Sequence, residues 1–177
     1  MNIEVEIRSF ISEKQYKDLI EFFNKNSQFL NEDFQETYYF DTKDDIRIQR
    51  NNFFAKIWMK KGKVHDEMRE ETEIKFDKND FEKIEELFNK IGVNIKIKWF
   101  RNRHEFNWDG IKVCVGYTRG YGYILELEKM SDENNKEKAL EELKEKLKLL
   151  NIQLTSKEEF EKKFEYYKNN WKILIGK

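Results

Sequence analysis

Hydrophobic and charged residues alternate at the start of the chain. In residues 3–8, IEVEIR, every second side chain is Ile or Val, and those between are charged. Successive side chains of a strand point to opposite faces, so this pattern predicts a strand with one apolar and one charged face. The segment ILELEK near residue 125 repeats it. A half-buried strand with a solvated face explains either segment alone. The alternative is that the charged faces line a wide barrel.

Apolar residues at helical spacing predict four helices. The first opens with a capping box at Ser12–Gln15 and runs to about Asn26. We expect the second to begin at Asn79 or Asp80 and stop at Gly92, the third to begin at Ser131-Asp132 and reach Leu150, and the fourth to begin at Thr155 or Ser156 and reach about residue 170.

Eight strands are expected between these helices, at about 2–10, 34–41, 45–50, 53–61, 67–76, 95–107, 111–117 and 121–129. Asp109-Gly110 is typical of a tight hairpin turn. The predicted fold class is α+β, an eight-stranded antiparallel β-barrel with helices packed outside. No Pro/Ser-rich linker interrupts the sequence, so we expect one domain over 1–177, with barrel strands at about 2–129 and C-terminal helices at about 131–170.

Composition narrows the class of protein. Charged residues make up 39% of the 177, yet the net charge is −1, so neither nucleic acid nor an anionic membrane is an expected partner. A single cysteine excludes a disulfide framework and a cysteine-rich zinc site. We see no signal peptide and no apolar run of about 20 residues, as a membrane span needs. A cytoplasmic protein is expected.

The other expected strands also carry charges on one face. Lys56 and Lys60 alternate with Ile57 and Met59, while residues 71–75 and 101–105 place acidic and basic side chains at every second position. Helices could cover the apolar faces from outside, which would leave the charged faces inside the barrel. A lumen lined by carboxylates and cations suits a hard divalent cation with a phosphate chain.

Six segments, in order, resemble the motifs of the CYTH superfamily, also called triphosphate tunnel metalloenzymes. Glu4-x-Glu6-x-Arg8 resembles its E-x-E-x-K motif, with Arg in place of Lys. The further matches are Tyr39-Phe40-Asp41-Thr42 with YFDT, Arg47 with the first arginine of LRxR, Lys60 before Lys61-Gly62 with the lysine of LTxKG, Arg101-Asn102-Arg103 with KxR, and residues 120–128 with GLGxFxExE. The sequence is most similar to the branch that holds class IV adenylyl cyclases, with thiamine triphosphatases as more distant members.

This resemblance implies a tunnel that binds a triphosphate such as ATP, thiamine triphosphate or tripolyphosphate, and it makes a homodimer plausible. The implied metal ligands, for Mg²⁺ or Mn²⁺, are Glu4, Glu6, Glu126 and Glu128. The implied phosphate-binding residues are Arg8, Arg47, Lys56, Lys60, Arg101 and Arg103. Glu71 and Glu73 match acidic positions of the fifth strand and are the candidate catalytic residues, in a supporting or water-activating role.

Two positions depart from the family pattern. Gly116 stands where the cyclase-like motif has an aspartate, ten residues before Glu126, and Gln49 replaces the second arginine of LRxR, with Arg50 on the other face. The missing carboxylate favours hydrolysis of a triphosphate over a class IV adenylyl cyclase that converts ATP to cyclic AMP and pyrophosphate. A third alternative is a protein that binds nucleotide or polyphosphate without turnover.

Other reactive or aromatic residues have simpler explanations. Strand parity places His104 opposite Arg103, where packing or exposure is expected, and Cys114 lies in an apolar-looking strand, where an inert thiol is expected. Tyr117, Tyr121 and Tyr123 either finish strand ends or stack a base at the tunnel mouth.

Overall fold

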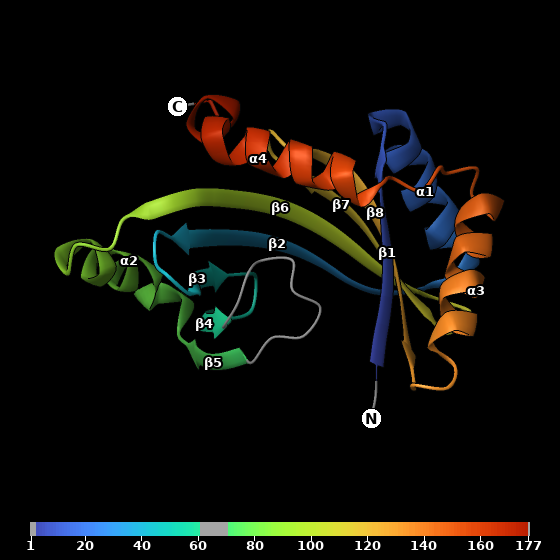
Figure 1. Ribbon diagram of the computed structural model, residues 1–177, viewed down its shortest axis with the longest axis horizontal. Coiled ribbons are helices and arrows are strands. Elements are labelled where there is room, and N and C mark those ends of the chain that lie inside the picture. Colours follow the sequence, from blue (N-terminus) through green and yellow to red (C-terminus); the bar gives the residue numbers. More distant parts are fainter. Residues whose placement is uncertain (1–2, 61–70, 177) are drawn as a thin grey trace. The chain divides into compact units, whose positions relative to one another are not determined.

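The computed structural model describes residues 3–60 and 71–176, with Lys60 and Glu71 described by their backbone only. Eight strands and four α-helices follow one another in this part of the chain (Figure 1). In order they are β1 (Ile3–Ile11), α1 (Glu13–Asn26), β2 (Gln28–Phe40), β3 (Asp45–Arg50), β4 (Ala55–Lys60), β5 (Glu71–Phe76), a 3-10 helix η1 (Lys78–Asp80), α2 (Phe81–Lys90), β6 (Ile95–Trp108), β7 (Ile111–Thr118), β8 (Gly122–Ser131), α3 (Lys136–Leu149) and α4 (Lys157–Leu174).

The strands form one eight-stranded antiparallel sheet in the order β1-β8-β7-β6-β2-β3-β4-β5. The predicted α+β class, with eight antiparallel strands and helices packed against them, is therefore confirmed. In the described residues the series of ladders runs from β1 to β5 without joining these two strands, an order that is compatible with the predicted tunnel-like barrel.

The chain divides into two compact units, Met1–Glu32 with Asn102–Asn169, and Asp33–Arg101 with Asn170–Lys177. In the first unit, α1 packs on β7 and β8, and α3 packs on β1 and β8 (Figure 1). Its apolar core lies beneath these helices and contains Phe23, Phe106, Leu125, Leu127 and Leu143. In the second unit α2 contacts β3, over a core built around Tyr38, Ile48 and Phe81. The prediction of a single domain stays a prediction.

Local signals in the sequence set several element ends. The capping box of α1 forms as predicted: Gln15 N–H donates to Ser12 Oγ at 3.2 Å, and Ser12 N–H donates to Gln15 Oε1 at 2.8 Å. Asp109 and Gly110 join β6 to β7 with φ of 54° and 79°. Positive φ at both central residues is the geometry of a type I′ turn, which matches the twist of an antiparallel hairpin.

The structure differs from the predicted boundaries in three places. β2 begins at Gln28, six residues earlier than expected, because the polar run Asn31–Asp33 hides the strand pattern. β8 extends to Ser131, and Asp132 accepts hydrogen bonds from the N–H groups of the next turn, so α3 begins only at Lys136. The predicted strand residues 67–70, and residue 61 at the end of the predicted strand 53–61, lie outside the described residues.

The start of α4 is fixed to β1 within the first unit. Ser156 Oγ accepts a hydrogen bond from Glu159 N–H at 3.2 Å, as a helix N-cap does. Thr155 instead serves the strand: its Oγ1 accepts from Phe10 N–H at 2.9 Å. The rings of Phe10 and Phe160 stack at 4.4 Å between centroids. Of the two predicted caps, Ser156 therefore caps the helix and Thr155 holds it against β1.

None of the helices in the described residues is long and apolar enough to cross a membrane.

Arg50 faces α2, on the side of β3 away from Gln49, as parity predicts. Its Nε donates to Glu36 Oε2 at 2.6 Å, its Nη1 pairs with Glu82 of α2, and its guanidinium carbon lies 4.7 Å from the centre of the Phe81 ring. Glu36 is 7% exposed, so its charge is largely removed from water. Arg50 thus stabilises the packing of α2 on the sheet and takes no part in the opposite face.

We expect Arg50→Met to lower the free energy of unfolding by about 2–3 kcal/mol, because it leaves the buried Glu36 carboxylate without its cation. Urea unfolding at neutral pH measures this change. Lys83→Met, which removes an exposed ion pair with Asp80 on the same helix, is the control and should change the free energy by less than about 0.5 kcal/mol. Equal stability of both variants would contradict a stabilising role for Arg50.

Candidate functional site

The first unit gathers charged side chains on one face of β1, β8 and β7. Glu6 lies opposite Glu128, and Arg8 lies opposite Glu126, in the β1–β8 ladder. In the β7–β8 ladder Lys112 lies opposite Glu128, and Cys114 lies opposite Glu126. Directly opposite residues share a face of the sheet. The other face is the apolar one, packed beneath α1 and α3.

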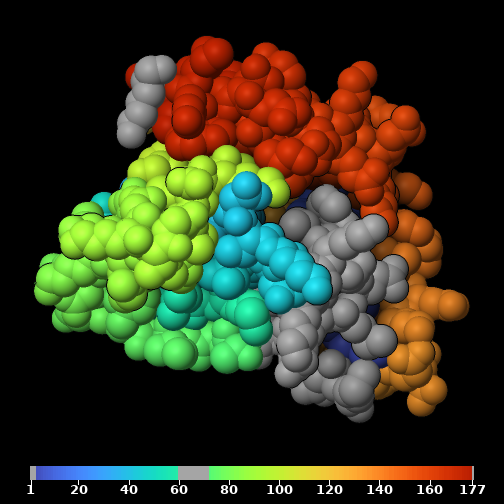
Figure 2. All heavy atoms as spheres, turned by 60° about the vertical axis from the view of Figure 1, so that its left-hand side comes forward, coloured from blue at the N-terminus to red at the C-terminus, as the bar shows by residue number. Residues whose placement is uncertain are grey.

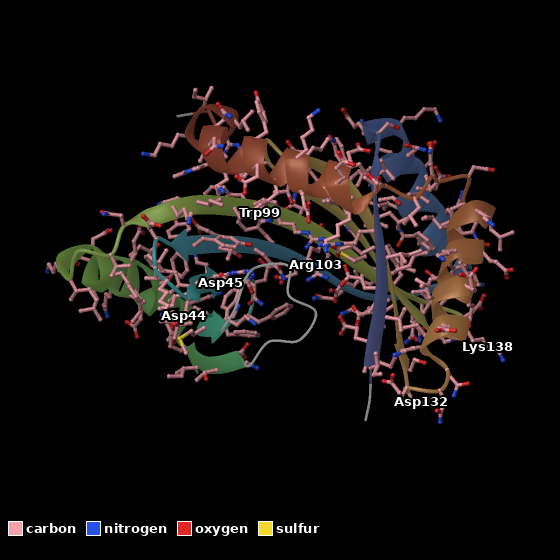
Figure 3. All side chains as sticks on the ribbon, viewed as in Figure 1. Asp44, Asp45, Trp99, Arg103, Asp132 and Lys138 are labelled. Carbon is pink, nitrogen blue, oxygen red and sulfur yellow. The ribbon has the colours of Figure 1, made fainter. Side chains whose placement is uncertain are left out.

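Arg103, on β6, is a cation of this face and is labelled in Figure 3. Its Nη2 lies 3.0 Å from Glu105 Oε1 and 3.8 Å from Glu126 Oε2, and its Nε donates to Cys114 Sγ at 3.1 Å. Burial by itself would lower the pKa of Arg103, but its electrostatic interaction and hydrogen bond with Cys114 and the negative charges of Glu126 and Glu105 raise it. The guanidinium is therefore a permanent positive charge beside the predicted metal ligand Glu126.

Two further cations contact the carboxylates of this face. Lys112 Nζ lies 3.5 Å from Glu128 Oε2 and 3.8 Å from Glu105 Oε1. Arg8 Nε lies 3.2 Å from Glu6 Oε1, and its guanidinium carbon is 5.1 Å from the centre of the Phe160 ring of α4. Glu6, Glu126 and Glu128, three of the predicted metal ligands, thus each have the side chain of an arginine or a lysine within 4 Å.

The acidic groups nevertheless repel one another. Burial raises the pKa of Glu6, the charges of Glu126, Glu4 and Glu128 raise it further, and Arg8 partly offsets them. Burial also raises the pKa of Glu128; Lys112 lowers it, while Glu4 raises it through its charge and a hydrogen bond. A raised carboxyl pKa means that the ionised form is disfavoured here. An added cation would therefore be stabilised on this face.

In the second unit, the face of β3, β4 and β5 turned away from α2 is also charged. Asp45 pairs with Lys60, Arg47 with Trp58 and Gln49 with Lys56 in the β3–β4 ladder, and Trp58 pairs with Glu73 in the β4–β5 ladder. By the same alternation Ile46, Ile48 and Ile57 lie on the opposite side of these strands, in the core beneath α2.

Cations and aromatic rings alternate along this second face. The Arg47 guanidinium carbon lies 4.2 Å from the centre of the Tyr39 ring and 5.6 Å from that of Trp58, and Arg47 Nε donates to Asp45 Oδ1 at 2.7 Å. Lys56 Nζ lies 4.6 Å from the Trp58 ring centre and 2.7 Å from Glu73 Oε2. Trp58 is only 6% exposed. Stacking and ion pairing hold both cations in fixed positions, so they can receive an anion with little reordering.

Each unit thus brings together part of the predicted site. The first unit holds Glu4, Glu6, Arg8, Arg103, Glu126 and Glu128, and the second holds Arg47, Lys56, Lys60, Glu71, Glu73 and Arg101. Lys60 and Glu71 are paired in the β4–β5 ladder, but their side chains lie outside the description. Arg101 is half-buried on β6. All twelve assignments of function stay predictions.

The donors of the first face suit a hard divalent cation, because carboxylate oxygens are the ligands that Mg²⁺ and Mn²⁺ prefer. In the residues that the structure describes, no three acidic, His or Cys side chains lie close enough together to hold a metal ion. The chemical type of the ligands and the raised pKa values of Glu6 and Glu128 fit a divalent cation, while Glu6, Glu126 and Glu128 contact Arg8, Arg103 and Lys112.

Neither Lys112 nor the ion pair of Asp45 with Arg47 was predicted from the sequence. Lys112 shares the parity of Cys114 and Gly116, so alternation along β7 could have placed it on the charged face. Cys114, which was expected on an apolar-looking strand, also lies on this face, opposite Glu126. The apolar residues of β7 are those between, such as Val113 and Val115, which lie in the core on the other side. Gly116 lies opposite Ile124, and neither residue supplies a carboxylate.

The tyrosines of β7, of β8 and of the turn between them divide between the two faces. Tyr123 lies opposite Ile11 and its ring packs 4.9 Å from Tyr16 of α1 and 4.6 Å from Tyr117, between centroids. Tyr117 and Tyr123 therefore belong to the packing beneath α1, as the simpler explanation predicts. Tyr121 contacts Phe10 at 5.3 Å between centroids, on the other side.

Comparison with known proteins gives a consistent result. A sequence model of the CYTH domain matches residues 2–161. A protein of Methanocaldococcus jannaschii with the name "Putative adenylate cyclase" is 35% identical over 162 residues, which cover 85% of this chain and 90% of that protein.

Solved structures share the fold. A conserved hypothetical protein from Pyrococcus furiosus has a TM-score of 0.66 and 26% identity, over 85% of this chain and 92% of its own. A Hippeastrum protein, described as an adenylyl cyclase candidate with a dominant triphosphatase activity, has a TM-score of 0.61 and 20% identity, over 89% and 93% of the two chains.

The raised pKa of Glu6 predicts how Glu6→Gln changes stability with pH. The folded-state pKa lies above the ordinary value of 4.5, so the folded protein binds the proton more tightly and loses stability as pH rises through the folded pKa. In metal-free protein we expect Glu6→Gln to raise Tm by about 1–3 °C at pH 7, a modest value because the side chain is 37% exposed. The gain should vanish below about pH 4.

Calorimetry in EDTA from pH 4 to pH 8 measures this difference. Glu145→Gln, on an exposed position of α3, is the control and should show no such dependence on pH. A lower Tm for Glu6→Gln at neutral pH would show that the ionised carboxylate stabilises the face.

Proposed function

Because the chain belongs to the CYTH domain family, we propose that it is a divalent-metal-dependent enzyme that binds a triphosphate on its charged strand faces and hydrolyses it. The observation that carries this proposal is the contact of Arg103 with both Glu126 and Glu105 on one face of the first unit. A fixed guanidinium beside a set of carboxylates offers one group for phosphate oxygens and another for a metal ion.

The proposed metal ligands are Glu4, Glu6, Glu126 and Glu128, with Mg²⁺ or Mn²⁺ as the ion. Such an ion, when bound, would neutralise phosphate oxygens and orient the phosphate chain. The residues of the protein do the rest of the binding. Positive side chains would hold the chain of phosphates in line for attack, and the proposed ones are Arg8, Arg47, Lys56, Lys60, Arg101 and Arg103.

Glu73 and Glu71 are the proposed catalytic residues. A carboxylate can accept a proton from water as the water oxygen bonds to the terminal phosphorus and the bridging P–O bond breaks. Glu73 contacts Lys56 at 2.7 Å, so a proposed phosphate-binding cation and a proposed base lie side by side on adjacent strands. Glu71 is two residues away on the same strand, in register with Lys60.

The alternative within this family is adenylyl cyclase, the activity in the name of the Methanocaldococcus relative. Cyclisation needs the ribose 3′-hydroxyl of ATP to attack the α-phosphorus, so that pyrophosphate leaves. Gly116 supplies no carboxylate to β7, which favours hydrolysis. The Hippeastrum neighbour, similar in fold, is a precedent for triphosphatase activity on this architecture. Binding of nucleotide or polyphosphate without turnover is the second alternative.

One assay separates these functions. Purified protein is incubated with tripolyphosphate, thiamine triphosphate or ATP, with Mg²⁺ or Mn²⁺, and phosphate and cyclic AMP are both quantified. Phosphate release supports the triphosphatase, and cyclic AMP with pyrophosphate supports the cyclase. Saturable binding in calorimetry with neither product supports a binding protein. Lack of binding and of product with all three compounds would contradict the proposal.

We expect Glu126→Gln to reduce metal-dependent phosphate release by roughly 10²-fold or more, because a proposed metal ligand loses its charge. Glu128→Gln should have a similar effect. The matched control is Glu142→Gln: this residue lies on α3 and pairs with Lys129 at 2.6 Å, away from the charged face. Unchanged rates in the Glu126 and Glu128 variants would remove both from the site.

A further inference from the structure

Lys112 occupies a special place among the cations of the first unit. Its ammonium lies 3.5 Å from Glu128 and 3.8 Å from Glu105, so it bridges β8 and β6 from the strand between them. The two carboxylates are 23% and 18% exposed, whereas the Lys112 side chain is 41% exposed. The cation is therefore more exposed to water than the two acids that it contacts.

The contact of Lys112 with Glu128 opposes the repulsion within the acidic group. Glu128 lies directly opposite Glu6 across the ladder, and the charge of Glu4 adds to the repulsion. Lys112 is the group that lowers the pKa of Glu128 against these effects. In the protein without metal, the positive charge that this position requires is supplied by a lysine of the chain itself.

We propose that Lys112 is a tethered counter-cation that a divalent metal ion must displace from Glu128, and that it thereby sets the metal affinity of the face. This inference rests on the proposed metal site. An ammonium and a metal ion cannot both occupy the same carboxylate oxygen, so the free energy of the Lys112–Glu128 pair is subtracted from that of metal binding. After displacement, Lys112 keeps Glu105 as a partner within its reach.

Lys112→Met tests the proposal, because Met is uncharged and of similar length. Mn²⁺ binding is measured by the loss of the free-ion electron paramagnetic resonance signal, without triphosphate and without turnover. We expect Lys112→Met to bind Mn²⁺ roughly three- to tenfold more tightly than the unaltered protein, as loss of a partly exposed ion pair and of one nearby positive charge implies. Lys112→Arg, which keeps the charge, should bind as the unaltered protein does.

Lys129→Met is the matched control for net charge. Lys129 lies on β8 next to Glu128 in sequence but points to the opposite face, where its Nζ is 2.6 Å from Glu142 Oε1. Both variants lose one positive charge from the same part of the sheet. A similar gain in Mn²⁺ affinity in Lys112→Met and Lys129→Met would show that only net charge matters, and would overturn the proposal. An unchanged or weaker affinity in Lys112→Met, or no measurable binding, would also overturn it.

The outcome can be separated from that of the proposed function. Circular dichroism first establishes that each variant is folded, and Lys112→Gln replaces Lys112→Met if the latter is not. If the unaltered protein binds Mn²⁺ and Glu126→Gln abolishes that binding, the metal site stands whatever Lys112→Met does. If instead Mn²⁺ binds equally well to Glu126→Gln and Glu128→Gln, the proposed metal ligands fail, and the displacement from Glu128 fails with them.

Discussion

The opposition of Glu6 and Glu128 across the β1–β8 ladder is the constraint on which the first unit depends. Two carboxylates at directly opposite positions repel each other, and partial burial increases the cost. The fold tolerates this pair because Arg8 and Lys112 each lie within 4 Å of one member, and the apolar side of the same strands is packed beneath α1 and α3. The sheet thus keeps concentrated negative charge at its surface, and packing on the opposite side stabilises the strands that carry it.

In the second unit, cations rather than carboxylates are gathered on one face of the sheet, and acidic and aromatic side chains stabilise them. Arg47 and Lys56 are held by Asp45, Glu73 and the faces of aromatic rings, while Trp58 remains nearly inaccessible between them. Figure 2 shows β5 and α2 of this unit in green. Arg50, one residue beyond Gln49, pairs with the buried carboxylate of Glu36 on the side of β3 that faces α2. Alternation alone decides which arginine is available to a ligand and which supports a helix, although the two are close in sequence.

Alternation and capping made most of the fold predictable. The capping box at Ser12, the turn at Asp109 and the charged faces all follow from short-range patterns, which local geometry determines. The early start of β2 at Gln28 did not follow, since its polar residues carry no period-two signal. The contacts of Lys112 and Cys114 with neighbouring strands also did not follow, because they depend on register between segments that are distant in sequence. Parity gives the face of a residue, but only the register gives its neighbours.

The turn at Asp109 and Gly110 has a consequence for how this gene family can vary in length. With two residues in the turn, Val113 faces the helices and Cys114 faces the carboxylates. Inserting or deleting one amino acid there would invert every side chain of β7 relative to β6. Valine would then stand in the place of Cys114 beside Arg103, and a lysine would enter the apolar core. Substitutions along β7 can accumulate singly, whereas changes in the length of this hairpin must come in pairs or be absorbed by a bulge.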